Sequence, residues 1–273
     1  MKLLYLNWQK LGLGLAVILS CVPFAGAAEQ TLTKEQMREF LLSAKVTRST
    51  QSKKGITNPF RLTLTDGTVT HDGSFQAVDE HKARMEFDDG HVELNFVDSY
   101  KYNIAAYALA ELLAVDDMLP VYVERKWNGK AGSLSWWLPV KMDEGERLKQ
   151  KISAPDPDAW NKQMYRIRVF DALVYDTDPN LTNVLIGEDW KIWRVDFSRS
   201  FRLFNEIKNP KDLVQCDRQL FTHLKALDSK EVMERTKNYL SKSEVDALMA
   251  RRDKIVAYFD KLISEKGESK VLY

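Results

Sequence analysis

The sequence predicts an α+β fold in two lobes, a mainly β lobe with one key helix followed by a mainly α lobe. Three observations indicate this order. Residues 60–86 alternate apolar and polar side chains, which is typical of strands. Beyond residue 210 the apolar residues recur at helical spacing. Between these regions, residues 184–195 hold two short apolar runs around a Gly-Glu-Asp turn, which predicts one β-hairpin embedded among the helices.

The first lobe is expected to begin with a helix, because Thr33 and Gln36 form a capping box ahead of an apolar stripe. After the strands, a β-hairpin is expected around Gly90, since two alternating runs flank an Asp-Asp-Gly turn. Residues 101–115 predict a helix with one apolar face. A second hairpin is expected over residues 119–140, with its turn at Asn-Gly.

The second lobe is expected to hold a helix at residues 160–174 that leads into a polar loop. A long helix is expected near residues 243–264. Arg251 and Arg252 lie on this helix, and we predict that they belong to a solvated face. The remaining residues of the lobe predict shorter helices.

The chain has 273 residues and a net charge of +1, with 40 Lys and Arg against 39 Asp and Glu. This balance gives no general attraction to nucleic acid or to an anionic membrane, so we expect no nucleic-acid partner. An aromatic content of 11% indicates a well-filled core and not a disordered chain. The sequence does not indicate the oligomeric state.

We divide the chain into a signal peptide at residues 1–27, a first lobe at residues 28–140 and a second lobe at residues 141–273. The first segment has basic residues, an apolar stretch at residues 11–19 and small residues up to Ala27. That stretch is too short to cross a bilayer, so we expect cleavage after Ala27 and export to the periplasm or medium. We expect no membrane span in the cleaved chain.

Two alternatives remain for the N-terminus, an uncleaved anchor and lipidation at Cys21. Lipidation is the less favoured, because the bulky Leu19 fits a lipobox poorly. After cleavage only Cys216 remains, so no intramolecular disulfide is possible. We expect Cys216 to be a buried apolar residue.

The residues with the clearest chemistry lie between positions 170 and 201. Asp178 lies in a polar loop, Asn183 follows five positions later, and Asp196 ends the second run of the expected hairpin. The hairpin would bring Asn183 and Asp196 together at its open end. Their oxygens suit Mg²⁺, a hard cation that prefers oxygen ligands. The plainer alternative is a loop and hairpin with solvated Asp and Asn at turn positions.

This pattern resembles a group of atypical kinases: the HipA-like kinases, the type II phosphatidylinositol 4-kinases and the secretory-pathway casein kinases. The resemblance rests on Asp176-Thr-Asp178-Pro-Asn-Leu-Thr-Asn183, on Asp196-Phe-Ser-Arg-Ser-Phe201, and on a helix-and-strand segment at residues 96–125. It covers roughly residues 55–201. It implies a two-lobed kinase-like fold, ATP with Mg²⁺ or Mn²⁺ as cofactors, and phosphoryl transfer to a hydroxyl. Asp178 would be the catalytic residue, and Asn183 and Asp196 would hold the metal.

The nucleotide side departs from the family pattern. Asn103 stands where the family has a glutamate that pairs with the ATP-binding lysine. Either Gln76 stands in place of the family's ATP-binding lysine, or Lys82 supplies its positive charge from a shifted position. The only turn similar to a phosphate-covering loop contains Gly55 and Thr57. We assign these five residues to nucleotide binding as implied by the resemblance.

Two classes of function therefore stay open. The first is an exported atypical kinase that acts on a protein, lipid or small-molecule hydroxyl, and the sequence does not say which. The second is a catalytically impaired pseudokinase that binds a nucleotide or serves as a scaffold. Nucleotidyl transfer on the same fold is a further alternative, since the same metal site would serve it.

Overall fold

Helix α1 (Lys34–Ser43) begins the described part of the molecule, a computed structural model that describes residues 32–52, 59–87, 90–178 and 180–273. The expected capping box of Thr33 and Gln36 is present. The helix packs on strands β6 and β7 of the first sheet. Arg125 on β6 donates to the carbonyls of Leu41 and Ala44, both at 2.6 Å, and so satisfies carbonyls at the end of α1. The predicted signal peptide and Cys21 lie outside the described residues.

The first sheet is antiparallel and has the strand order β1-β2-β3-β7-β6. Its strands are β1 (Lys45–Gln51), β2 (Phe60–Thr65), β3 (Thr70–Gln76), β6 (Tyr122–Trp127) and β7 (Lys130–Trp136). The hairpin that turns at Asn128-Gly129 joins β6 to β7, as predicted. Strand β1 was not predicted, because nearly all of its side chains are exposed and it lacks an apolar alternation.

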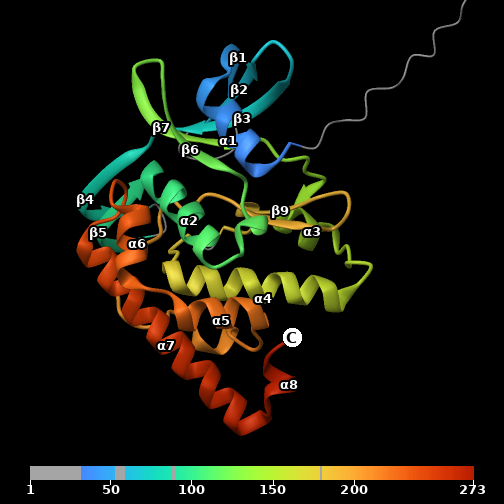
Figure 1. Cartoon of the computed structure of the whole chain (residues 1–273), viewed down its shortest axis with the longest axis vertical. Coiled ribbons are helices and arrows are strands. Elements are labelled where there is room, and N and C mark those ends of the chain that lie inside the picture. Colours follow the sequence, from blue (N-terminus) through green and yellow to red (C-terminus); the bar gives the residue numbers. More distant parts are fainter. Residues whose placement is uncertain (1–31, 53–58, 88–89, 179) are drawn as a thin grey trace, which may run out of the picture. The chain divides into compact units, whose positions relative to one another are not determined.

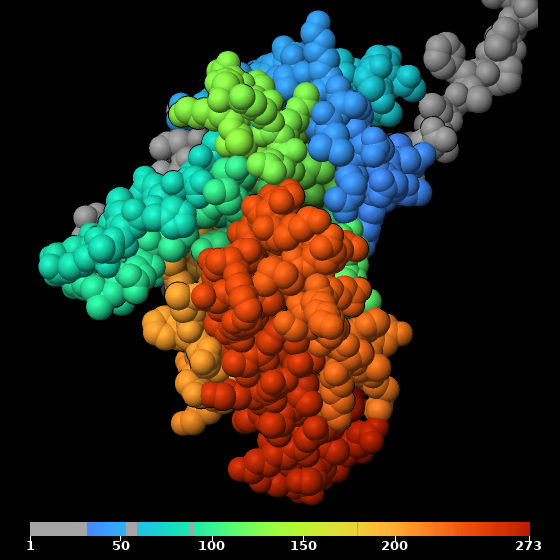
Figure 2. Space-filling view, turned by 60° about the vertical axis from the view of Figure 1, so that its left-hand side comes forward, coloured from blue at the N-terminus to red at the C-terminus, as the bar shows by residue number. Residues whose placement is uncertain are grey.

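Strands β4 (Asp79–Glu86) and β5 (Val92–Ser99) form a separate two-stranded ribbon. It confirms the hairpin expected around Gly90; its strands extend farther from the turn than the expected runs at residues 84–87 and 91–96. In Figure 2 the ribbon, in teal, stands out from the rest of the unit at residues 33–273. In the chain the ribbon lies between β3, which carries Gln76, and helix α2, which carries Asn103.

Helix α2 (Tyr100–Leu112) is buried on nearly all sides, whereas the sequence predicted a single apolar face. It packs against β6 and β7 on one side and against helix α6 on the other. Figure 1 shows it between the sheet and the helices of the second lobe. A helix enclosed in this way needs small or apolar side chains all round, and its run of alanines and tyrosines supplies them.

A second, three-stranded sheet has the order β10-β9-β8. Strands β9 (Val184–Ile186) and β10 (Ile192–Arg194) form the predicted hairpin. Strand β8 (Met142–Asp143) pairs with β9 and was not predicted, since two residues show no periodicity. The stretch from residue 137 to residue 141, where the lobe boundary was placed, joins the two sheets without helix or strand.

The rest of the second lobe is helical, with α7 packing along α4, α5 and α6 (Figure 1). Its helical elements are α3 (Glu144–Gln150), α4 (Pro157–Val174), η2 (Leu181–Asn183), η3 (Pro210–Asp212), α5 (Arg218–Ala226), α6 (Ser229–Thr236), α7 (Lys242–Lys266) and α8 (Glu268–Val271), whereas the short η1 (Asp116–Met118) lies in the first lobe, between α2 and β6. The predicted mixed fold, with a sheet first and helices after, is confirmed. Cys216 is buried, as expected, and burial raises the pKa of its thiol. None of the described helices has the length and apolar character needed to span a bilayer.

Candidate active site

Asn183 and Asp196 both lie at the open end of the β9–β10 hairpin. The register pairs Arg194 with Val184, and the Val195 amide donates to the Asn183 carbonyl at 3.0 Å. Each candidate metal ligand therefore lies directly next to the paired end of its own strand. The local sequence alone sets this arrangement, because a short turn leaves little freedom in the strand register.

Asp178 and Asn183 contact each other directly. The Asn183 Nδ2 donates to Asp178 Oδ2 at 3.0 Å, and the Asn180 amide donates to Asp178 Oδ1 at 3.1 Å. Asn183 is buried. The bond to Asp178 uses the Asn183 amide nitrogen and not its Oδ1, and a carbonyl-type oxygen of that kind is a suitable ligand for a hard cation.

Asp196 has φ 61°, in the left-handed region that residues other than glycine seldom adopt. Such conformations concentrate at functional sites, where the surrounding structure holds them. Its Oδ1 accepts two long hydrogen bonds, from the Ser198 amide at 3.4 Å and from Gln76 Nε2 at 3.5 Å. Bonds of this length are weak, so the carboxylate keeps most of its capacity to accept a cation.

An amide bridge joins Gln76 on β3 to Asn103 on α2. Asn103 Nδ2 donates to Gln76 Oε1 at 2.6 Å and to Ser133 Oγ at 3.3 Å. The Asn103 Oδ1 accepts the backbone amide of Phe197 at 2.7 Å. Three segments far apart in the sequence thus meet at one asparagine, next to Asp196. The bridge is neutral, whereas the resemblance implies an ion pair in this place.

The role predicted for Asn103 changes accordingly. Its side chain is buried, and both of its amide hydrogens are used within the protein. It therefore positions Gln76 and the backbone after Asp196, and its contribution to nucleotide binding would act through these two partners.

Lys82 is not brought to this cluster. It lies on β4 with its side chain 45% exposed, and its ammonium pairs with Glu80 at 2.8 Å and lies over the Phe96 ring. Gln76, and not Lys82, stands beside Asp196, so the alternative assignment to Lys82 does not fit the structure. Gly55 and Thr57 lie outside the described residues.

A buried arginine connects the two loops of the site, and sequence reasoning missed it. Arg194 Nη2 donates to Asp176 Oδ2, and Arg194 Nη1 donates to the carbonyls of Val195 and Asp196. Asp176 Oδ1 in turn accepts the Asp178 backbone amide at 3.2 Å. Arg194 therefore holds the loop of Asp178 and the loop of Asp196 in one network. The only signal in the sequence was a charged residue inside an apolar strand.

In this network, burial and the attraction between opposite charges shift the pKa values in opposite directions. Burial raises the pKa of the Asp176 carboxyl to about 6, against the lowering effect of Arg194. Burial disfavours the charge on Arg194, but Asp171 and Asp176 outweigh it and raise the pKa of the guanidinium. A buried charge cluster of this kind adds little net stability, yet removal of one member leaves the others unpaired.

Asp98 adds a second carboxyl near Asp196. Burial, and then the charge of Asp196, raise the pKa of Asp98, which also hydrogen-bonds the Ser198 side chain. Within the described ranges, no group of three or more His, Cys, Asp and Glu side chains is placed to hold a metal. Asn183 and Asp196 would therefore need further oxygen ligands, and Mg²⁺ commonly takes these from substrate phosphates and water.

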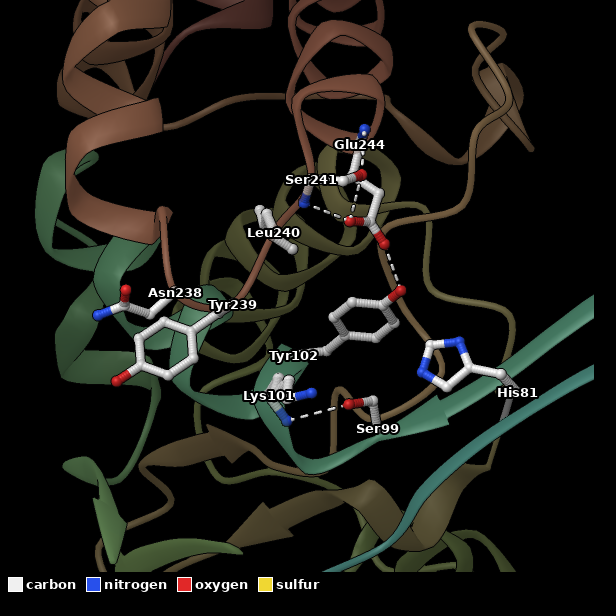
Figure 3. Close-up of a pocket in the computed structure, with 9 residues that line it drawn as sticks. All are labelled: His81, Ser99, Lys101, Tyr102, Asn238, Tyr239, Leu240, Ser241 and Glu244. Atoms are coloured by element: carbon white, nitrogen blue, oxygen red, sulfur yellow. Dashed lines mark hydrogen bonds between the residues drawn. The ribbon is translucent and has the colours of Figure 1, made fainter. Parts of the chain in front are cut away.

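A polar cavity of about 240 Å³ lies apart from these residues, where α2 begins and the loop before α7 passes (Figure 3). Tyr102 and Glu244 line the cavity and form a hydrogen bond with each other, while His81 lies on another wall. Lys101 lines it too, with its ammonium on Asp79 at 2.9 Å. The cavity contains none of the candidate site residues.

No family model matches the chain, and no curated protein is similar to it in sequence. Solved structures are similar in fold. The Golgi casein kinase with Mn/ADP bound has a TM-score of 0.58 and 12% identity, over 88% of this chain and 79% of that one. A second structure of the Golgi casein kinase has a TM-score of 0.58 and 13% identity, over 88% and 78%. The proinflammatory kinase CtkA of Helicobacter pylori has a TM-score of 0.52 and 9% identity, over 81% and 97%.

These similarities confirm a kinase-like fold. At such low identity they show the fold, and the residues of this chain must carry any finer statement.

Proposed function

We propose that this protein is an exported atypical kinase-like phosphotransferase that moves a phosphoryl group from ATP to a hydroxyl acceptor. The observation that carries the proposal is the contact of Asp178 with Asn183, next to Asp196, at the end of one hairpin on a kinase-like fold. Phosphoryl transfer needs mainly positioning and neutralisation of phosphate charge; Asp178 would supply the first, and a cation held by Asn183 and Asp196 the second.

The residues fit a divalent cation and a nucleotide. Asn183 Oδ1 and the Asp196 carboxylate would hold Mg²⁺ or Mn²⁺, with the remaining ligands from phosphates and water. The bound metal would neutralise negative charge on the phosphates. The similar Golgi casein kinase is described with Mn/ADP, which agrees with this pair of cofactors.

Asp178 would act on the acceptor. Its Oδ2 is held by Asn183 and its backbone amide by Asp176, so the carboxylate is fixed in position. In that position it orients the acceptor hydroxyl and accepts its proton as the oxygen attacks phosphorus. Arg194 fixes Asp176 from the interior and thereby keeps Asp178 aligned with Asp196.

Export rests on the signal peptide expected at residues 1–27. ATP is scarce outside the cytoplasm, so an exported kinase requires a compartment supplied with nucleotide or another phosphoryl donor. A scaffold protein needs no phosphoryl donor, so the scarcity of ATP would not restrict it.

The amide bridge favours the second candidate, a catalytically impaired module. A neutral glutamine stands beside Asp196 and is bridged to the neutral Asn103, so this pair itself gives no positive charge to the phosphates. Binding of ATP in such a site would depend strongly on the metal.

The first test is whether ATP binds and whether binding requires a metal. We expect saturating ATP with Mn²⁺ or Mg²⁺ to raise the melting temperature, and ATP with EDTA to give no shift. Titration calorimetry with the same pairs provides an independent measurement. No shift and no heat under any condition would contradict the nucleotide-binding site itself. Transfer is then followed with γ-labelled and α-labelled ATP, because γ-label on an acceptor indicates phosphoryl transfer and α-label indicates nucleotidyl transfer.

A second prediction addresses the amide bridge. Gln76→Lys combined with Asn103→Glu should restore the charged pair of the family, and we expect ATP–Mn²⁺ to bind about 10-fold more tightly. A hydrogen bond to a charged group is worth about 1.5–3 kcal/mol, which accounts for a change of this size. Asn103→Glu alone should lower the melting temperature, because it buries an unpaired carboxylate.

Calorimetry on both single variants and the double variant measures the coupling between the two sites. A folded double variant that binds ATP–Mn²⁺ no better than the parent would show that Gln76 does not face the phosphates.

A further inference from the structure

Two adjacent large hydrophobic side chains are exposed in the segment that follows Asp196. Leu203 and Phe204 are each 59% exposed. Scattered exposed hydrophobic residues are common, but two neighbours beside a candidate active site call for an explanation. Their surroundings in the chain are polar, with exposed Asn205 and with Glu206 paired to Lys254.

A fully buried arginine holds the backbone of this segment. Arg251 on α7 is 0% exposed, whereas the sequence predicted a solvated face. Its guanidinium donates to the carbonyls of Arg202 at 2.8 Å, Phe204 at 2.6 Å and Leu173 at 2.8 Å. Burial lowers its pKa to about 10, so the side chain stays charged at neutral pH. Arg251 therefore holds the backbone carbonyls of Arg202 and Phe204, which lie on either side of Leu203 in the chain.

The same segment lies against the loop of Asp178. The Phe201 amide donates to the Val174 carbonyl at 2.6 Å, and the Thr177 amide donates to the Arg199 carbonyl at 3.4 Å. The rings of Phe204 and Tyr175 lie 5.1 Å apart between centroids. Leu173, which Arg251 also holds, lies at the end of the helix that leads into this loop. The exposed apolar pair and the catalytic loop are thus parts of one fixed structure.

We propose that Leu203 and Phe204 form the binding surface for the acceptor, and that the acceptor is a polypeptide with an apolar side chain near its reacting hydroxyl. This inference rests on the proposed function. An apolar side chain of the acceptor would pack on the two exposed side chains while its neighbouring hydroxyl reaches Asp178. Contacts of rigid, pre-formed apolar residues cost little ordering entropy, which favours their use in recognition.

The shape and charge of the surface favour a polypeptide over the other acceptors. A small hydroxyl metabolite would need an enclosed pocket, and the cavity of Figure 3 lies at the start of α2 instead. A membrane-bound acceptor would favour a larger apolar face with a basic rim. Here the apolar pair is followed by the polar Asn205 and by the carboxylate of Glu206, which pairs with Lys254.

The test uses peptides with one central serine or threonine, in which each flanking position in turn carries Leu, Phe, Ser or Asp. Initial rates are measured with ATP and Mn²⁺. We expect Leu or Phe at one fixed position to lower KM about 10-fold relative to Ser, and Leu203→Ser/Phe204→Ser to abolish this preference. Leu203→Met/Phe204→Leu, which stays apolar, should retain it. Leu42→Ser is the matched control, because Leu42 is 46% exposed on α1 and distant in the chain from this segment.

Each result decides the proposal, with the thermal shift by ATP–Mn²⁺ recorded for every variant. The proposal is overturned by a preference that survives in Leu203→Ser/Phe204→Ser, by an equal loss in Leu42→Ser, or by the absence of any apolar preference. It is also overturned if ATP–Mn²⁺ binds but no peptide is labelled, or if only phosphatidylinositol vesicles or small alcohols are labelled. In those cases the proposed function stands. If ATP–Mn²⁺ does not bind, the proposed function fails first.

Discussion

Asp196→Ala is expected to abolish the metal-dependent binding of ATP and all phosphoryl transfer. Asp196 is the only carboxylate in the proposed metal pair, and its Oδ1 has only long hydrogen bonds to other groups of the protein. Loss of residues that merely support a metal ligand already costs about 10–100-fold in affinity, so loss of the ligand should cost at least 100-fold. The measurements are the ATP–Mn²⁺ thermal shift, calorimetry and transfer of γ-label.

Asp196→Asn is the matched control for the backbone. Asp196 has a positive φ, which alanine tolerates poorly and asparagine tolerates well. Both variants should fold, since loss of the charge also relieves its repulsion with Asp98. If Asp196→Ala, which leaves no side-chain oxygen at this position, still shows the full ATP–Mn²⁺ shift, the metal is held elsewhere.

Asp178→Asn should lower transfer by about 10²–10⁴-fold, the usual contribution of a general base. ATP–Mn²⁺ affinity should stay nearly unchanged, because Asp178 is proposed to act on an acceptor that the nucleotide complex lacks. The substitution is nearly isosteric, and the new amide oxygen can still accept from Asn183 Nδ2. Labelled transfer and calorimetry on the same protein separate the two effects.

Two outcomes would change the assignment of Asp178. Equal loss of nucleotide binding in Asp178→Asn and Asp196→Ala, with both variants folded, would make Asp178 part of the metal site. Undiminished transfer in Asp178→Asn would remove it from the mechanism.

The local features of this site were predictable from the sequence. The β9–β10 hairpin, which places Asn183 and Asp196 at its open end, depends on two short apolar runs and a tight turn. The contact between Asp178 and Asn183 spans five positions in one loop. Within such short stretches, steric limits on the backbone and the pairing register leave few alternatives, so spacing is informative.

Strands β1 and β8 could not be predicted from the alternation of apolar and polar side chains. Strand β1 exposes most of its side chains, and β8 has two residues. Their backbone hydrogen bonds to β2 and β9 hold them in place. Backbone groups are the same in every residue type other than proline, so no side-chain periodicity marks such strands.

The buried polar residues were decided only by the tertiary structure. The sequence predicted a solvated position for Arg251 and showed Arg194 only as a charged residue within an apolar strand. In the structure, backbone carbonyls bind Arg251 and a carboxylate binds Arg194, and these partners come from other segments of the chain. Asn103 likewise joins residues 27 and 94 positions away. Burial of a charged or amide group costs several kcal/mol unless its partners are in place, and only the folded chain assembles those partners.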